Sequence, residues 1–179
     1  MPMELIRQIC LVALLVERLA ELWISGRNLS WSMARGGREY GHGHYPWMVA
    51  LHSTMLLSMV SEWVYAPWII NEWLFGMFAG VCVAAQILRW WVILTLGRQW
   101  NTRVVVIPGA RQVTTGPFRF CAHPNYLAVV IEMLFLPWFF GAFWTGILFS
   151  VLNIWMLRVR IRVEDDALRE LSGRGHGPI

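Results

Sequence analysis

A histidine-proline step opens one apolar stretch of the chain, and an arginine and a glutamate follow the last apolar stretch. His123 and Pro124 form the step, and Arg160 and Glu164 form the later pair. Pro124 suits the first turn of a helix, where its missing N–H costs nothing, and it disfavours α geometry at His123. A side chain there can face the free N–H groups of the helix start, which attract anions such as carboxylates. The alternative is an ordinary helix start with an incidental histidine.

The helix that begins at Pro124 carries a carboxylate about two turns inside it. Asn125, Val129 and Glu132 follow helical spacing and share one face. Ionisable groups at this depth in an apolar segment are rare and usually line a cavity. Glu132 is therefore a candidate general base. It can instead be the partner of a buried arginine such as Arg89, or a carboxyl group that burial keeps protonated.

Arg160 and Glu164 lie four residues apart and share a helix face. Because arginine before glutamate is the weaker order for a helical ion pair, a shared ligand explains the two residues better than a salt bridge does. Convergence of this pair with His123 predicts a site reached from water on one side and from lipid on the other. A run of charges after an apolar helix is also typical of a simple cytoplasmic anchor.

Charged residues also interrupt the first apolar stretch. Glu17, Arg18 and Glu21 lie in its second half, and Asn28 follows soon after. These residues either pair with one another or form one wall of a polar cavity.

The histidines and cysteines do not form a metal-binding pattern. His42 and His44 lie close together, but nothing nearby supplies the remaining ligands. His52, one turn into the second apolar stretch, is expected to be a hydrogen-bonded interior residue. The 3 cysteines show neither metal-ligand spacing nor a disulfide pattern. We therefore predict no metal.

The composition is that of a membrane protein. Hydrophobic residues make up 57% of the 179 residues and charged residues only 15%, against about 45–50% and about 25% in soluble domains. The 12 tryptophans suit the bilayer interface, where an apolar ring and one N–H are both satisfied. All 15 basic residues are arginines, and they alternate with membrane-length apolar runs. We therefore expect membrane lipids as partners and exclude nucleic acid.

Five segments approach the length of about 20 apolar residues that a membrane helix needs. We predict an all-α, polytopic integral membrane protein with spans at Leu5–Ile24, Trp47–Tyr65, Trp73–Leu96, Asn125–Phe140 and Ala142–Val159. The uncharged turn at Gly141 predicts that the last two helices form a tight hairpin. The first span lacks a small-residue cleavage signal, so we expect it to be retained. The chain is read as one membrane-embedded domain, 1–179, with three helices in 1–96 and the cofactor-binding loop, hairpin and cytoplasmic tail in 97–179.

Arginines indicate the side of the membrane on which each connection lies, because cytoplasmic loops carry the excess of positive charge. With five crossings, Arg7, Glu62 and Glu72 share one side. The other side holds Arg27, Arg35, Arg38, Arg98, Arg103, Arg111, Arg119, Arg158, Arg160, Arg162, Arg169 and Arg174. An even number of crossings would split this group. We therefore predict a multi-pass protein of the cell membrane with its N-terminus outside and its C-terminus in the cytoplasm.

The two long connections, Ser25–Pro46 and Gly97–Ala122, fall on the cytoplasmic side in this topology. The second contains a β-prone run, Val104–Ile107, which a Pro-Gly turn ends. We expect an ordered lid over the site rather than a slack linker.

Residues 97–170 resemble the isoprenylcysteine carboxyl methyltransferase family of integral membrane enzymes. The matching residues are Gly116-Pro117-Phe118, then His123-Pro124-Asn125-Tyr126, then Arg160, Glu164, Asp165 and Leu168. The resemblance implies S-adenosylmethionine bound between the last two helices and the cytoplasmic loops. The cofactor contacts that it implies are His123, Pro124, Tyr126, Arg160 and Glu164. One position departs from the family, which usually has arginine directly before the histidine; this chain has Ala122, and Arg119 is the candidate substitute.

The first half resembles a bacterial branch of that family through Glu21, Asn28, residues 36–39 and residues 44–46. The branch implies methylation of a hydroxyl group on an alkylpyrone or alkylresorcinol lipid. A prenylcysteine-like carboxylate is the other possible acceptor. The residues expected to contact the acceptor are Glu21, Asn28, Arg89 and Asn125.

Methyl transfer needs the acceptor atom, the methyl carbon and the sulfur in line, so positioning supplies much of the catalysis. A carboxylate acceptor needs no base, whereas a hydroxyl benefits from one, and Glu132, Glu164 and His123 are candidates. We predict Glu132 as the base, with Arg160 and Glu164 as further catalytic residues. Two rivals stay open. Residues 121–126 also resemble the Cys-x-His-Pro-Asn-Tyr segment of NADPH-dependent membrane sterol reductases, and a non-catalytic lipid-binding subunit explains the same apolar helices.

Overall fold

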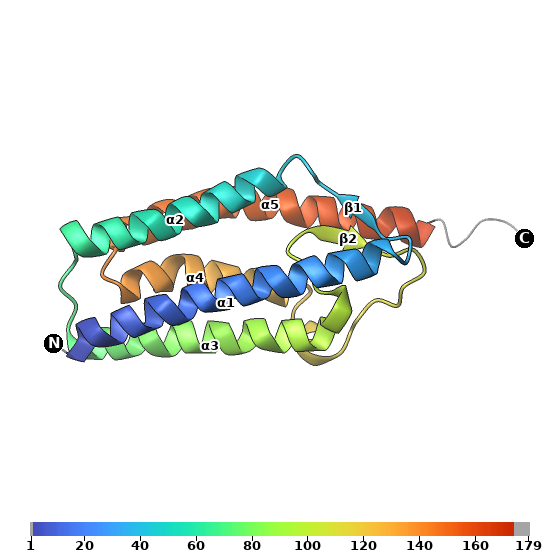
Figure 1. Ribbon diagram of the computed structural model, residues 1–179. Coiled ribbons are helices and arrows are strands. Elements are labelled where there is room, and N and C mark those ends of the chain that lie inside the picture. The colour runs from blue at the N-terminus through green and yellow to red at the C-terminus, as the bar shows by residue number, and fades with distance from the viewer. Residues whose placement is uncertain (1, 174–179) are drawn as a thin grey trace, which may run out of the picture.

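Five helices form an elongated bundle in the computed structural model, which describes residues 2–173 (Figure 1). They are α1 Pro2–Met33, α2 Tyr45–Tyr65, α3 Glu72–Leu96, α4 Pro124–Phe139 and α5 Phe143–Gly173. The helical class and the place of all five helices are therefore confirmed. Helices α1 and α5 continue well past the apolar stretches that predicted them. Arg174 and the rest of the predicted cytoplasmic tail lie outside the described residues.

The connections gather by type at the two ends of the bundle (Figure 1). One end carries the N-terminus of α1, the α2–α3 connection and the α4–α5 turn. The other end carries both long connections and the last turns of α5. The two arginine-bearing long connections and the last turns of α5 therefore share one end, whereas Arg7 lies at the other end, as the charge distribution predicted.

The predicted hairpin of α4 and α5 is present and tight. Residues 140–142 join the two helices, and Gly141 has a φ of +79°. A Cβ atom at Gly141 would lie 2.9 Å from the carbonyl oxygen of Trp68, so only glycine fits this turn. Helix α4 has 16 residues, which gives it a length of about 24 Å. It is shorter than the hydrocarbon core of a bilayer, which is about 30 Å thick.

The two long connections meet in a small sheet. Strand β1, Arg38–Tyr40, pairs antiparallel with β2, Val104–Val106. The β-prone run of the second connection is thus confirmed, but its partner strand in the first connection was not predicted. Short 3₁₀ turns at Gly97–Gln99 and Gly116–Arg119, η1 and η2, flank β2 and complete an ordered cap over this end of the bundle.

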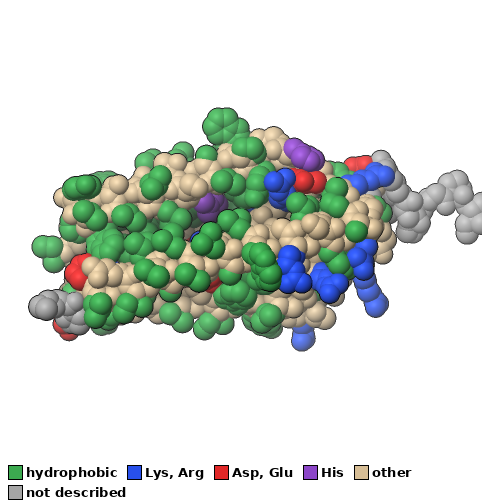
Figure 2. Space-filling model, in the orientation of Figure 1, with side chains coloured by type: hydrophobic (Ala, Val, Ile, Leu, Met, Phe, Trp, Pro, Cys, Tyr) green, Lys and Arg blue, Asp and Glu red, His purple; other side chains and the backbone are tan. Residues whose placement is uncertain are grey.

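The outer faces of the helices are apolar. Leu19 of α1 is 67% exposed, Leu57 of α2 70%, Ile87 of α3 64% and Trp155 of α5 65%. Figure 2 shows apolar side chains along the helices, with basic side chains gathered at the end that carries the sheet. Soluble proteins rarely expose apolar patches of more than a few hundred Å².

Within residues 2–173, one helical segment, Glu72–Gln99, combines the length and the apolar composition of a membrane span, and α4 is apolar but shorter. Helix α1 is long enough, but Glu17, Arg18 and Glu21 interrupt it. Glu21 is only 5% exposed, so this charge faces the interior of the bundle and leaves the outer face of α1 apolar.

Candidate active site

Helix α4 begins as the histidine-proline step predicted. His123 is the residue before the helix, with φ −128° and ψ 64°, and Pro124 is the first helical residue. The His123 ring stacks on the ring of Tyr126, with 5.3 Å between centroids and 21° between planes. The His123 side chain makes no hydrogen bond to the N–H groups of the helix start. Stacking on Tyr126 fixes the plane of the imidazole, whose nitrogens face α5.

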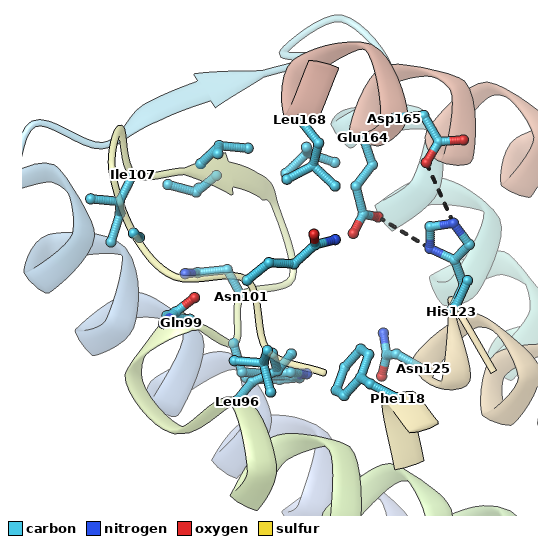
Figure 3. Close-up of a pocket in the computed structure, with 18 of the residues that line it drawn as sticks. Leu96, Gln99, Asn101, Ile107, Phe118, His123, Asn125, Glu164, Asp165 and Leu168 are labelled. Carbon is cyan, nitrogen blue, oxygen red and sulfur yellow. Dashed lines mark ion pairs between the residues drawn. The ribbon is translucent and has the colours of Figure 1, made fainter. Parts of the chain in front are cut away.

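Tyr126 joins the arginine and the glutamate of α5. Its hydroxyl accepts a hydrogen bond from Nε of Arg160 at 3.2 Å and donates one to the Glu164 carboxylate. The His123 ring faces two carboxylates, with Nδ1 4.0 Å from Glu164 and Nε2 3.5 Å from Asp165 (Figure 3). The convergence of these residues is confirmed. Arg160 and Glu164 are linked through the tyrosine hydroxyl, and no direct ion pair joins them within residues 2–173.

Arg160 also connects α5 to two other parts of the fold. One guanidinium nitrogen donates to the carbonyl oxygen of Thr102, and another contacts the sulfur of Met48 in α2. The side chain is 7% exposed. The buried Arg160 of α5 therefore contacts the second long connection, α2 and α4, and fixes their positions relative to α5.

A pocket of about 380 Å³ lies between the second long connection, the start of α4 and the end of α5. In Figure 3, Glu164 and Leu168 of α5 face Leu96 and Phe118 across this pocket. Its size is within the about 300–1,000 Å³ range of small-molecule sites. Because it lies where the resemblance implies the methyl donor, it is called the donor pocket below.

Several polar atoms in the walls of the donor pocket have no hydrogen-bond partner. They are Nε1 of Trp100, both side-chain amide atoms of Asn101 and Oδ1 of Asn125, all buried. Buried polar atoms are nearly always paired in proteins. These atoms are therefore positions at which a polar ligand would complete the structure.

The donor pocket carries both signs of charge. Arg103, Arg111 and Arg160 line it together with Glu164 and Asp165. The hydrogen bond from Nη1 of Arg103 to the Glu39 carboxylate, 2.8 Å long, raises the pKa of Arg103 and holds it on the sheet.

Ala122 lines the pocket, in place of the arginine that the family usually has. Arg119 is exposed and is absent from the lining. The expected substitution by Arg119 is therefore not what the structure has, because η2 turns this side chain to the surface.

Glu132 lies in a second polar cluster, separate from the donor pocket. Both of its oxygens accept hydrogen bonds from Arg89, the first at 2.9 Å. Nε of Arg89 also lies 3.5 Å from Glu21, and Arg18 pairs with Glu21 at 2.9 Å. The arginine partner that the sequence left open is thus present. This arrangement argues against Glu132 as a free base, because Arg89 engages both oxygens.

The four predicted acceptor contacts fall into three places. Glu21 and Arg89 belong to the second cluster, and Asn125 lines the donor pocket. Asn28 donates to the carbonyl oxygens of Gly97 at 3.1 Å and Trp100 at 2.7 Å. Its amide nitrogen therefore fixes the second long connection to α1.

The sequence did not single out Met48, Trp100, Asn101 or Thr102. Met48, Trp100 and Thr102 have their places through long-range contacts, and the local sequence around these residues carries no signal. Within residues 2–173, no group of three His, Cys, Asp or Glu side chains could hold a metal, and the three cysteines are free.

Comparisons with known proteins place these residues in a wider context. The model of the isoprenylcysteine carboxyl methyltransferase family matches residues 78–170. The residues linked to Tyr126 directly or through Arg160 and His123 are called the Tyr126 network: Met48, Thr102, His123, Tyr126, Arg160, Glu164 and Asp165. All of them except Met48 lie within the matched range. The uncharacterized protein YpbQ of Bacillus subtilis strain 168 is 38% identical over 159 residues, covering 89% of this chain and 94% of that protein. An uncharacterized protein of Haemophilus influenzae strain Rd is 23% identical over 163 residues, covering 90% and 92%. No solved structure matches the chain.

Proposed function

Because this chain belongs to the isoprenylcysteine carboxyl methyltransferase family, a family of membrane methyltransferases, we propose that it transfers a methyl group from S-adenosylmethionine to an oxygen atom of a lipophilic acceptor. The observation that carries the proposal is the donor pocket, where the Tyr126 network meets a wall of unpaired polar atoms.

The residues of the donor pocket suit the groups of S-adenosylmethionine. Arg160 would attract the carboxylate, and Glu164 would attract the ammonium group and the sulfonium charge. The unpaired amides of Asn101 and Asn125 would hydrogen-bond to the nucleoside, beside the ring of Phe118. The donor supplies a methyl group on a positively charged sulfur, and the residues of this chain hold it and exclude water.

The membrane placement rests on the apolar outer faces of the helices. We infer five crossings, with charges such as Arg89 and Glu132 turned into the bundle, where they pair. The end that carries the donor pocket and the arginines is placed in the cytoplasm, with the N-terminus outside. A water-soluble donor then reaches its pocket from water, and the acceptor reaches the bundle from lipid.

The acceptor is proposed to be a polyketide-type lipid hydroxyl, with a prenylcysteine-like carboxylate as the alternative. Either oxygen must lie in line with the methyl carbon and the sulfur, which positioning by the bundle achieves.

The test is transfer of labelled methyl from S-adenosylmethionine by the purified protein in lipid nanodiscs. The acceptors are a long-chain alkylresorcinol, farnesylcysteine and a total lipid extract. We expect label in lipid, and about a 100-fold loss in Glu164→Gln if its charge holds the donor. The matched control is Glu72→Gln, because Glu72 is an exposed glutamate at the start of α3, far from the donor pocket.

Two results would decide against the proposal. Binding of NADPH without binding of S-adenosylmethionine would favour the reductase. Failure of both cofactors to protect the protein against unfolding would favour a non-catalytic lipid-binding subunit.

A further inference from the structure

A second cavity opens inside the bundle between α1, α2 and α4. Its volume is about 40 Å³, which gives room for a hydroxyl group and the atoms beside it but is far below the about 300–1,000 Å³ of a whole small-molecule site. The backbones of α1 and α2 hardly approach each other within the described chain. Figure 2 shows a hollow between these helices, and His52 lines the cavity. The cavity therefore has a side opening towards the apolar surroundings of the bundle.

Three polar and six apolar residues line the cavity, and Val129 is an apolar residue on the side nearer the donor pocket. On each of the three helices, a polar residue has an apolar residue one turn further from the donor pocket. The pairs are Arg18 and Leu14 on α1, His52 and Leu56 on α2, and Glu132 and Leu136 on α4. This gradient matches an amphiphile whose polar head points to the donor pocket and whose tail points along the apolar body.

His52 presents one nitrogen that is not engaged. Its Nδ1 lies 2.8 Å from the carbonyl oxygen of Met48, and a carbonyl only accepts, so Nδ1 carries the proton. Among the described residues nothing hydrogen-bonds to Nε2. In the neutral imidazole, Nε2 is then a lone pair that can accept a proton.

Arg18 supplies two nitrogens that make no hydrogen bond in the same cavity. Its Nη1 pairs with Glu21, but Nε and Nη2 are buried and make no hydrogen bond. The nearest carboxylate oxygens to Nη2 lie 3.6 Å away in Glu17 and 3.7 Å away in Glu132. An oxygen atom of a ligand in the cavity would satisfy these donors, and the guanidinium would stabilise negative charge on it.

The cavity and the donor pocket are close neighbours. Met48 contacts Arg160, which donates to Tyr126 in the donor pocket. His52 follows Met48 by one turn of α2, a rise of about 6 Å. On α4, Asn125 lines the donor pocket and Val129, one turn further, lines the cavity. The charged groups around His52 are thus Arg18 and Glu132 in the cavity, with Arg160 beyond Met48 and Arg89 behind Glu132.

We propose that this cavity receives the hydroxyl-bearing edge of a lipid head with a weakly acidic hydroxyl group and that His52 is the general base. The proposal rests on the proposed function. Nε2 accepts the hydroxyl proton while the oxygen forms a bond to the methyl carbon, and the electrons of the breaking carbon–sulfur bond return to sulfur. The products are a methyl ether, a neutral thioether and an imidazolium, which then releases its proton to water.

The test compares acceptors within each variant, so that a loss of folded protein cancels. The acceptors are a long-chain alkylresorcinol, a more acidic long-chain alkylpyrone and farnesylcysteine, whose carboxylate has no proton to lose. In His52→Asn, the side-chain amide can still donate to Met48, but the base is gone. We expect the ratio of resorcinol to farnesylcysteine methylation to fall about 100-fold, the low end for a general base. The ratio for the pyrone should fall less, because its enol is already partly ionised.

His52→Gln tests the same loss with a different shape, and His42→Asn is the matched control, since its side chain is 69% exposed at the surface. A second readout needs no donor: alkylresorcinol binding, followed by tryptophan fluorescence, should weaken about 10-fold in Arg18→Met, as expected for loss of a hydrogen bond from a charged group.

Three outcomes would overturn the inference: equal losses for all three acceptors in His52→Asn, no loss for any of them, or wild-type transfer to farnesylcysteine alone. In each case the proposed methyl transfer still stands. If the wild type transfers methyl to no acceptor, the proposed function fails and takes this inference with it.

Discussion

Replacing Tyr126 with phenylalanine tests whether one hydroxyl group organises the donor pocket. The change keeps the ring that stacks on His123 and removes only the oxygen between Arg160 and Glu164. Arg160 keeps its contacts with Thr102 and Met48, so the fold should survive.

The cost falls mainly on Arg160, because the two partners differ in exposure. Arg160 is 7% exposed, whereas the side chain of Glu164 is 33% exposed and can turn to water. An unpaired buried N–H costs about 1–3 kcal/mol. We therefore expect the free energy of unfolding to fall by about 1–3 kcal/mol. We also expect affinity for S-adenosylmethionine to fall about 10-fold, which corresponds to about 1.4 kcal/mol.

Unfolding is followed by near-UV circular dichroism in nanodiscs, and donor affinity by calorimetry. Tyr65→Phe is the matched control, because Tyr65 is 86% exposed at the opposite end of the bundle. If Tyr126→Phe binds the donor as the wild type does and unfolds at the same denaturant concentration, the hydroxyl does not organise the pocket and the reasoning fails.

Three further predictions concern stability, each measured by thermal unfolding in nanodiscs. Glu132→Gln leaves the buried Arg89 without its bidentate partner and should lower the free energy of unfolding by about 3–5 kcal/mol. The double variant Glu132→Leu with Arg89→Met should recover most of that loss, and an equal loss in the single and the double variant would contradict a stabilising ion pair. Burial, with a contribution from Arg160, lowers the pKa of His44, so the unfolded chain binds the proton more readily, and stability should decline as the pH falls from about 6.5 towards the lowered pKa. His44→Asn should flatten that part of the pH curve, and an unchanged slope would refute the assignment. Gly141→Ala should cost more than about 1 kcal/mol because of its positive φ and the nearby Trp68 carbonyl, whereas Gly80→Ala, in open space on a helix, should cost nothing.

The helices and the hairpin could be predicted because their signals are local. Apolar runs of membrane length placed all five helices, and the uncharged turn at Gly141 placed the hairpin. Proline at the first helical position fixed the start of α4, and the four-residue spacing of Arg160 and Glu164 put them on one face.

The walls of the donor pocket could not be predicted, because they depend on pairing between distant segments. Strand β1 lies more than sixty residues before β2, and neither strand shows the other's register in its sequence. Asn28 was expected to contact the acceptor because the resemblance implied it. Its amide nitrogen donates to Gly97 and Trp100, a pairing that appears only when α1 lies beside η1.

His52 shows why a residue type alone does not settle a role. The expected interior hydrogen bond is present, but that bond is what fixes the proton on Nδ1 and leaves Nε2 for a ligand. Nδ1 thus makes the structural contact, and Nε2 is the nitrogen with the proposed catalytic role.

Arg160 links the donor pocket to the cavity that holds His52. Its guanidinium reaches Tyr126 in the donor pocket, Thr102 in the second long connection and Met48 on α2. If the guanidinium moves to meet the carboxylate of a bound donor, it must pull on Met48, one turn from His52. Donor binding should therefore change the affinity for the acceptor, and by thermodynamic linkage acceptor binding should change the affinity for the donor by the same factor; titration of each ligand with and without the other measures this.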